Sequence, residues 1–274
     1  MQPLLITPGD PAGIGPEIVA RAYLAGELKQ ALIVGHPDVM RRGLMACSAH
    51  DIELQIFQNV SHWQASSSRS ALSIWNPPEH LNSPYDINFS IAHGVDWLSI
   101  PWGRIDARCA AEATRCIYAA IEIARSGQAS ALVTAPLHKE ALAIAGIEFP
   151  GHTEMLQTWS ASEPLPVRMM LANPELRVVL VTIHMALRRA IDAIQFDNVL
   201  ETIRIAHASA WQWGQAHPRI AVAGLNPHAG EGGLFGDEEL HVIAPAIAAA
   251  KEMGIQVSGP YAPDTVFMRA RHTP

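Results

Sequence analysis

The sequence predicts an α/β protein with a largely parallel sheet, and two observations carry this prediction. Short apolar runs without polar alternation recur along the chain, as expected for parallel strands that are covered on both faces. Segments of helix length separate these runs, which is typical of right-handed βαβ units. With 274 residues, 49% of them hydrophobic, the chain is long enough for two domains. We expect a first domain over residues 1–128 to which 255–274 returns, a second over 129–254, and an active-site cleft between them.

The first half alternates predicted strands and helices. The strands are residues 3–7, 31–35, 52–57 and 72–75, and helices are expected to begin at Pro16, Pro37 and Asp106, the last running to about Arg125. A glycine-rich loop, residues 8–15, connects the first strand to the first helix. Its spacing matches neither the dinucleotide fingerprint nor the P-loop, so a tight connector is favoured over an anion-binding loop.

The second half continues the same alternation. The predicted strands are residues 129–134, 176–182, 219–225 and 255–258. Helices are expected over 188–194 and 199–214, and another is expected to end near Ile247, after a second glycine-rich loop at 229–236.

Composition excludes several classes of partner. There are 19 basic and 26 acidic residues, for a net charge of -7, and no basic stripe of the kind that nucleic-acid binders show. No apolar run approaches the roughly 20 residues of a membrane span, and the N-terminal region lacks the pattern of an export signal. Three cysteines, an odd number, suit a reducing compartment. We therefore expect a cytoplasmic protein that binds neither nucleic acid nor membrane.

Histidines follow three of the predicted strands and are the main candidates for chemistry. His138, His184 and His228 each come at or just after a strand end, and His152 lies close to the first in sequence. Because the carboxyl ends of parallel strands meet at one edge, such histidines are candidates for a metal or phosphate site. Scattered structural histidines are an equally good interpretation of the pattern alone.

Two charged residues are further candidates. Lys139 is able to hold a phosphate or carboxylate as a point charge, although a lone lysine after a strand is usually solvated. Asp264 is either a turn residue, which the sequence favours, or a carboxylate of the site.

Five motifs together resemble the 4-hydroxythreonine-4-phosphate dehydrogenases of vitamin B6 biosynthesis. They are ITPGDPAGIGPE (6–17), TAPLHKEA (134–141), FPGHTE (149–154), LNPHAGEGGLFGDEE (225–239) and GPYAPDTVF (259–267). The resemblance covers essentially the whole chain. It implies the two-domain α/β/α fold shared with isocitrate and isopropylmalate dehydrogenases, which lacks the ordinary dinucleotide fingerprint.

The resemblance also implies roles for individual residues. His184 and His228 are expected to bind a divalent metal (zinc, magnesium or cobalt), and His152 and Thr153 to contact the substrate. Lys139 and Asp264 are catalytic candidates, and no cofactor-binding residue is assigned. The family's third metal-binding histidine lies in a YHDQG motif that the printed sequence does not contain. The family further implies a homodimer whose active site lies at the subunit interface.

The implied reaction uses NAD or NADP to oxidise 4-phosphooxy-L-threonine, with decarboxylation to 3-amino-2-oxopropyl phosphate. One alternative is a dehydrogenase of a related phosphorylated sugar acid, threonate or erythronate 4-phosphate. Another, expected if the polypeptide ended at Pro274 with two metal-binding histidines, is a non-catalytic remnant that binds phosphate or nucleotide. A metal-dependent hydrolase is a weaker third alternative.

Overall fold

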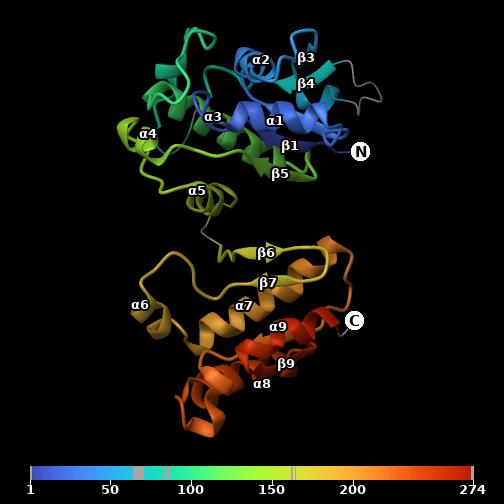
Figure 1. Cartoon of the computed structure of the whole chain (residues 1–274), viewed down its shortest axis with the longest axis vertical. Helices are drawn as coiled ribbons and strands as arrows, with labels where there is room; N and C mark the ends of the chain where they lie inside the picture. Colours follow the sequence, from blue (N-terminus) through green and yellow to red (C-terminus); the bar gives the residue numbers. More distant parts are fainter. Residues whose placement is uncertain are drawn as a thin grey trace. The chain divides into compact units, whose positions relative to one another are not determined.

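The computed structural model describes residues 2–63, 71–81, 83, 85, 87–161, 163 and 165–272. The chain forms two compact units, Met1–Leu165 and Pro166–Pro274, which are described separately (Figure 1). This division differs from the predicted boundary between residues 128 and 129. The reason is that strand β5 (Ala131–Thr134), predicted to open the second domain, hydrogen-bonds along its length to β1 (Leu4–Thr7) of the first.

Unit 1 is built around a five-stranded parallel sheet in the order β3-β4-β2-β1-β5. The remaining strands are β2 (Ala31–Val34), β3 (Glu53–Phe57) and β4 (Ala71–Trp75). At its centre Leu5 pairs with Leu32 on one side and with Leu132 on the other. All five strands agree with the sequence prediction to within two residues at each end, and the parallel pairing is confirmed.

Helices cover both faces of this sheet (Figure 1). On one face α1 (Gly15–Leu24) and α2 (Pro37–Ala46) enclose a core that includes Ile6, Ile33 and Met40. On the other, α3 (Ala107–Arg125) packs against a core that includes Leu5 and Leu32. Consecutive strand residues point to opposite faces, so a sheet covered on both sides requires apolar residues at every position.

Two 3₁₀ helices and two further α-helices complete the described part of unit 1. α4 (Lys139–Ile144) and α5 (His152–Trp159) pack on α3, in a core that contains Leu142, Met155 and Trp159. The 3₁₀ helices are η1 (Val60–His62) and η2 (Phe89–Ala92). β5 lies at the sheet edge, where Val133 is 47% exposed. The expectation of a strand buried on both faces is therefore wrong for β5 within this unit.

Unit 2 contains two small sheets rather than a continuation of one large sheet. β6 (Met170–Ala172) and β7 (Arg177–Val179) form an antiparallel pair, and β8 (Ile220–Ala223) pairs in parallel with β9 (Val257–Tyr261). The buried parallel strand predicted over 176–182 is thus a three-residue antiparallel strand. Within the segment 255–274, β9 pairs with β8 of the same unit.

The helices of unit 2 surround the β8–β9 pair and the loops that follow it. They are α6 (Leu187–Asp192), α7 (Phe196–Ser209), the 3₁₀ helices η3 (Ala210–Trp213) and η4 (Pro227–Gly233), the π-helix η5 (Glu239–Ile243), α8 (Ala244–Glu252) and α9 (Pro263–His272). A core that includes Val199, Ile203, Ile247 and Val257 joins α7 and α8 to β9. The sequence did not predict β6 or α9.

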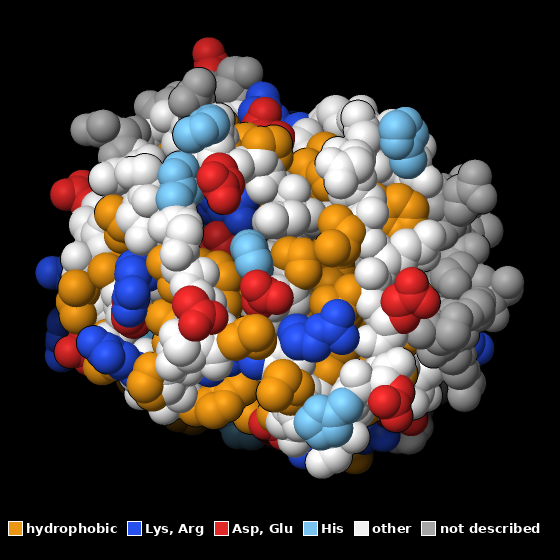
Figure 2. All heavy atoms as spheres, turned by 90° about the horizontal axis from the view of Figure 1, so that it is seen from above, with side chains coloured by type: hydrophobic (Ala, Val, Ile, Leu, Met, Phe, Trp, Pro, Cys, Tyr) orange, Lys and Arg blue, Asp and Glu red, His pale blue; other side chains and the backbone are white. Residues whose placement is uncertain are grey.

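The mixture of side chains on the surface of unit 1 agrees with a composition that has no basic stripe. Figure 2 shows the end of unit 1 that lies at the top of Figure 1, where acidic, basic and hydrophobic side chains are interspersed. Within the part of the chain that the structure describes, no helix combines the length and apolar character needed to cross a membrane.

Candidate functional site

Two loops meet at the carboxyl ends of the neighbouring strands β1 and β5. The backbone N–H of Asp10 donates to the carbonyl of Pro136 at 3.0 Å, and the N–H of Ala135 donates to the carbonyl of Thr7 at 3.0 Å. Gly9 has φ +70°, and a Cβ there would lie 2.4 Å from the Pro136 oxygen. The glycine-rich loop is therefore a tight connector, as favoured from the sequence, and it holds the 135–139 loop at the sheet edge where α/β proteins bind ligands.

A buried carboxyl group lies inside this junction. Asp10 is 5% exposed, and its Oδ1 accepts a hydrogen bond of 2.8 Å from the N–H of Ala12. Burial raises the pKa of Asp10, while the Ala12 N–H and the charges of His138 and Arg42 lower it. The carboxylate organises the loop and does not face solvent.

The thiol next to this carboxyl group is unsuited to nucleophilic chemistry. Burial, followed by the negative charges of Asp10 and Asp106, raises the pKa of Cys109 to about 12. Because the thiolate is the reactive form, Cys109 is a packing residue.

His138 has a structural role that the sequence did not reveal. Its Nδ1 accepts a hydrogen bond of 3.4 Å from the N–H of Ala141, so the ring caps the N-terminus of α4. Nδ1 is therefore occupied as an acceptor. Lys139, the first residue of α4, is exposed, and its ammonium group is accessible to a ligand.

The predicted substrate residues His152 and Thr153 open helix α5. The His152 Nε2 is shielded from solvent, yet it has no hydrogen-bond partner among the described residues. Burial lowers the pKa of His152, and the backbone carbonyl of Ala135 partly offsets this shift. The ring is therefore mainly neutral near pH 7, and its Nε2 is a buried nitrogen without a partner among the described residues. Thr153 is exposed beside it.

The two predicted metal ligands lie in unit 2, in unusual backbone conformations. His184 has φ +50° and His228 has φ +53°, and both side chains are exposed. His228 begins a run of six residues with positive φ, which includes Ala229 and Glu231 as well as three glycines. Left-handed backbone costs roughly 1–2 kcal/mol per non-glycine residue, so other interactions must hold this loop.

Glu239 supplies these interactions. It is 2% exposed, and its Oε1 accepts hydrogen bonds of 2.7 Å from the backbone N–H groups of Leu225 and Asn226. Its Oε2 accepts one of 2.9 Å from the Asn226 side chain, which also donates to Glu238 at 2.7 Å. Burial raises the pKa of Glu239, but these hydrogen bonds outweigh burial and the net shift is downward. A buried, ionised carboxylate thus fixes the turn that leads to His228.

The glycines of this motif make room for the carboxylate. A Cβ on Gly224 would lie 2.9 Å from the Glu239 Oε1, and one on Gly230 would lie 2.7 Å from its Oε2. The structure shows that the group they approach is a carboxylate of the same chain.

The structure does not bring the histidines of the three predicted strand ends onto one sheet edge. β5, β7 and β8 belong to three different sheets, and only β5 and β8 have parallel neighbours. Among the described residues there is no group of three or more His, Cys, Asp or Glu side chains placed to hold a metal. The imidazoles of His184 and His228 make no hydrogen bonds among the described residues, and imidazole nitrogens are common metal donors.

Asp264 lies in the first turn of α9, exposed to solvent. The preference for a turn residue was therefore wrong, because the sequence did not predict this helix. A carboxylate in the first turn complements the helix dipole, which accounts for Asp264 without a catalytic role.

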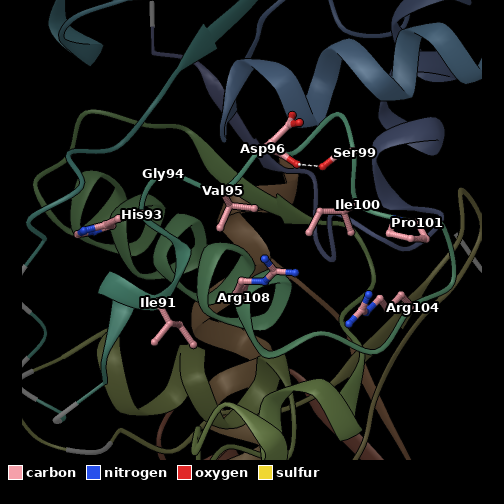
Figure 3. Close-up of a pocket in the computed structure, with 10 residues that line it drawn as sticks. All are labelled: Ile91, His93, Gly94, Val95, Asp96, Ser99, Ile100, Pro101, Arg104 and Arg108. Atoms are coloured by element: carbon pink, nitrogen blue, oxygen red, sulfur yellow. Dashed lines mark hydrogen bonds between the residues drawn. The ribbon is translucent and has the colours of Figure 1, made fainter.

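One feature of unit 1 was missed entirely from the sequence. A pocket of about 440 Å³ opens between the loop that follows η2 and the first turn of α3. Figure 3 shows two arginines, Arg104 and Arg108, among its lining residues. A pair of arginines flanking an N-cap aspartate, in RIDAR, was the available signal.

Comparison with known proteins settles the family. Residues 27–274 match the family model described as pyridoxal phosphate biosynthetic protein PdxA. The chain belongs to the PdxA family. The match extends through both units, so the fold is that of a PdxA dehydrogenase.

Individual PdxA relatives are similar over nearly the whole chain. A 4-hydroxythreonine-4-phosphate dehydrogenase from Beijerinckia indica is 44% identical over 270 residues, which cover 98% of this chain and 74% of the relative. A D-threonate 4-phosphate dehydrogenase from Pectobacterium atrosepticum is 39% identical, with 97% and 77% covered. The crystal structure of the Klebsiella pneumoniae 4-hydroxythreonine-4-phosphate dehydrogenase superposes with a TM-score of 0.86 at 35% identity, covering 99% of this chain and 77% of that one.

Proposed function

We propose that the protein is an oxidoreductase that uses NAD or NADP to oxidise and decarboxylate 4-phosphooxy-L-threonine, giving 3-amino-2-oxopropyl phosphate for pyridoxal phosphate synthesis. The observation that carries this proposal is the 44% identity to a dehydrogenase of that name over 98% of the chain. Support from the site comes from His152, whose buried Nε2 lacks a protein partner. A small phosphorylated substrate fits a site of this kind.

The chain's own residues have distinct roles in this proposal. The neutral His152 ring and the Thr153 hydroxyl orient the substrate through hydrogen bonds, and the Lys139 ammonium group attracts its phosphate or carboxylate. His184 and His228 hold a divalent cation (zinc, magnesium or cobalt) together with further ligands. When bound, that cation would supply a positive charge that stabilises negative charge on the substrate's C3 oxygen, and NAD or NADP would supply the hydride acceptor. As in the family, the working protein is proposed to be a homodimer.

The test is formation of reduced nicotinamide from 4-phosphooxy-L-threonine with each divalent cation. Replacing His152 by Asn is expected to lower kcat/KM by about 10- to 100-fold, because a hydrogen bond to a charged or developing-charge group is lost. His50→Asn is the matched control, since His50 is exposed and far along the chain from the site. Full turnover by the His152 variant would remove this residue from the mechanism.

A second substrate has specific support. The relative from Pectobacterium atrosepticum, 39% identical, is named for D-threonate 4-phosphate, a compound that carries a hydroxyl in place of the amine. Comparing kcat/KM for the two substrates decides between them. If neither is turned over, although a folded protein binds phosphate or nucleotide, the non-catalytic interpretation replaces both.

A further inference from the structure

The pocket in unit 1 combines paired cations with apolar walls. Arg104 and Arg108 lie on either side of Asp106 in sequence, and Figure 3 shows both side chains at the same opening. The volume of about 440 Å³ lies within the usual range for small-molecule sites. None of its lining residues was singled out in the sequence.

Asp106 fixes one of the arginines in place. Its carboxylate accepts hydrogen bonds from the Arg108 Nε at 2.9 Å and from the Arg108 Nη2 at 2.6 Å, while also capping α3. The hydrogen bond from Arg108, the largest influence, lowers the pKa of Asp106, so this carboxylate is ionised. Among the described residues the Arg108 Nη1 has no hydrogen-bond partner, and the orientation of its guanidinium group is already set.

Arg104 is held more loosely and keeps its donors. Its Nε lies 3.8 Å from the Asp106 carboxylate, and it donates no hydrogen bond within the described residues. Two guanidinium groups therefore face one carboxylate, which leaves a positive charge and several N–H donors unmatched. The remaining acid of the pocket, Asp96, is occupied differently: its Oδ1 accepts from the N–H of Leu98. In Figure 3 its carboxylate points away from Arg108.

The other walls suit an organic ligand. Ile91, Val95, Ile100 and Pro101 supply apolar surface. The His93 Nε2 lies 2.8 Å from the backbone carbonyl of Glu79, which can only accept, so Nε2 carries the proton and Nδ1 is left for the pocket.

The pocket adjoins the loops of the candidate site. The N–H of Gly103 donates to the carbonyl of Ala12 at 2.7 Å, which ties the pocket wall to the glycine-rich loop after β1. Asp106 also lies close enough to Asp10 to raise its pKa. A ligand in the pocket would therefore lie beside the ends of β1 and β5.

We propose that this pocket binds a phosphate monoester, with Arg104 and Arg108 as the phosphate ligands and the apolar walls against the organic part. Paired guanidinium groups match the geometry of phosphate oxygens. The phosphate has two possible sources, a nucleotide or a small phosphorylated substrate. The choice of a small phosphorylated substrate as the source rests on the proposed function. Phosphate binding itself does not, because it requires no turnover.

The experiment is calorimetric titration of the whole chain with three probes: inorganic phosphate, glycerol 3-phosphate and AMP. Arg104→Gln is expected to weaken phosphate-ester binding about 10- to 100-fold, since one charge-assisted contact is lost. The pair between Asp106 and Arg108 remains in this variant, so its unfolding midpoint is expected to stay unchanged. Arg125→Gln is the control, because Arg125 is an exposed arginine at the C-terminal end of α3, whose first turn borders the pocket.

The outcomes separate the possible sources. Tighter binding of AMP than of glycerol 3-phosphate supports the nucleotide, and equal or weaker binding of AMP supports a small phosphorylated substrate. Absence of saturable binding by all three probes, or affinities unchanged by Arg104→Gln, would overturn the proposal. Turnover is measured separately on the unsubstituted chain. Activity without pocket binding refutes the pocket alone, and binding without activity refutes only the proposed function.

Discussion

Glu239 is predicted to be the residue on which the conformation of the His228 loop depends most. We consider its replacement by Gln, which preserves size and removes the charge. The amide oxygen of Gln is able to accept from the N–H groups of Leu225 and Asn226, as the carboxylate does at 2.7 Å. Its NH₂ group would then face the Asn226 Nδ2, which the carboxylate meets at 2.9 Å. Two donors would oppose each other in a buried position.

The size of the effect follows from these contacts. Glu239 makes three hydrogen bonds as an ionised acceptor, and one such bond contributes about 1.5–3 kcal/mol. Glu239→Gln loses one bond and weakens the other two, so we expect a loss of about 2–3 kcal/mol in the free energy of unfolding of unit 2. Glu239→Ala removes all three and leaves a cavity, and is expected to cost about 3–5 kcal/mol.

The control is its neighbour Glu238. This carboxylate contacts the same Asn226 side chain at 2.7 Å but is only partly buried and makes no bond to the backbone of the turn. Glu238→Gln is expected to cost less than about 1 kcal/mol.

Two assays report on this prediction. Hydrogen exchange of the Leu225 and Asn226 amides measures the turn directly, and a loss of 2 kcal/mol corresponds to about 30-fold faster exchange. Binding of Co²⁺ or Zn²⁺ measures the consequence at His228, where we expect about 10- to 100-fold weaker affinity, as for other residues that orient metal ligands. Unchanged exchange at both amides in Glu239→Gln would refute the reasoning. Faster exchange with unchanged metal affinity would remove His228 from the metal site and leave the structural role of Glu239.

Three further results are expected. Gly9→Ala should destabilise unit 1 by more than about 2 kcal/mol, because the new methyl group would overlap a carbonyl of the 135–139 loop. Gly103 has a similar φ and open space around it, so Gly103→Ala should cost about 1 kcal/mol. Thermal unfolding of both variants checks this prediction, and equal losses of stability would contradict it. Arg115→Met should lower the free energy of unfolding by about 3–5 kcal/mol, because it leaves the buried Glu112 carboxylate, now 2.8 Å from Arg115, unpaired. Arg125→Met removes an exposed pair and should cost less than about 1 kcal/mol; chemical denaturation measures both. Burial lowers the pKa of His152 below its usual 6.5, so the contribution of this ring to stability should be complete above pH 6.5 and should be lost as the pH falls toward the folded-state pKa. His152→Asn should flatten that part of the plot of unfolding free energy against pH. An unchanged slope would count against the burial argument.

The sequence predicted unit 1 more accurately than unit 2. In unit 1 the strands belong to one parallel sheet and the helices have clear starts, such as the Asp106 side chain that caps α3. In unit 2 the strands are short and half-exposed, and β6 was not recognised. Short strands without a continuous apolar run carry little periodic signal, so their pairing depends on residues that are distant in sequence.

The candidate site was likewise predicted in part. The motifs identified the family and pointed to His152, whose buried, unpartnered nitrogen supports a role in binding. The strand-end pattern also made His138 a candidate for a metal or phosphate site, with a structural histidine as the equal alternative, and its Nδ1 caps α4. A histidine that binds a ligand and a histidine that caps a helix both occur just after a strand. Only the direction of the imidazole ring distinguishes the two roles.

The sequence by itself determined the α/β class, most element positions in unit 1 and the family, because strand and helix periodicity, capping residues and motifs are local features. The tertiary structure decided that β5 is the edge strand of the first sheet, that the last strand pairs with β8 in unit 2, and that Glu239 holds the turn before His228. It also decided that Arg104 and Arg108 share a pocket with residues from the loop after η2. Each of these features depends on contacts between segments that are far apart in the sequence. Such long-range contacts produce no periodic pattern in the local sequence.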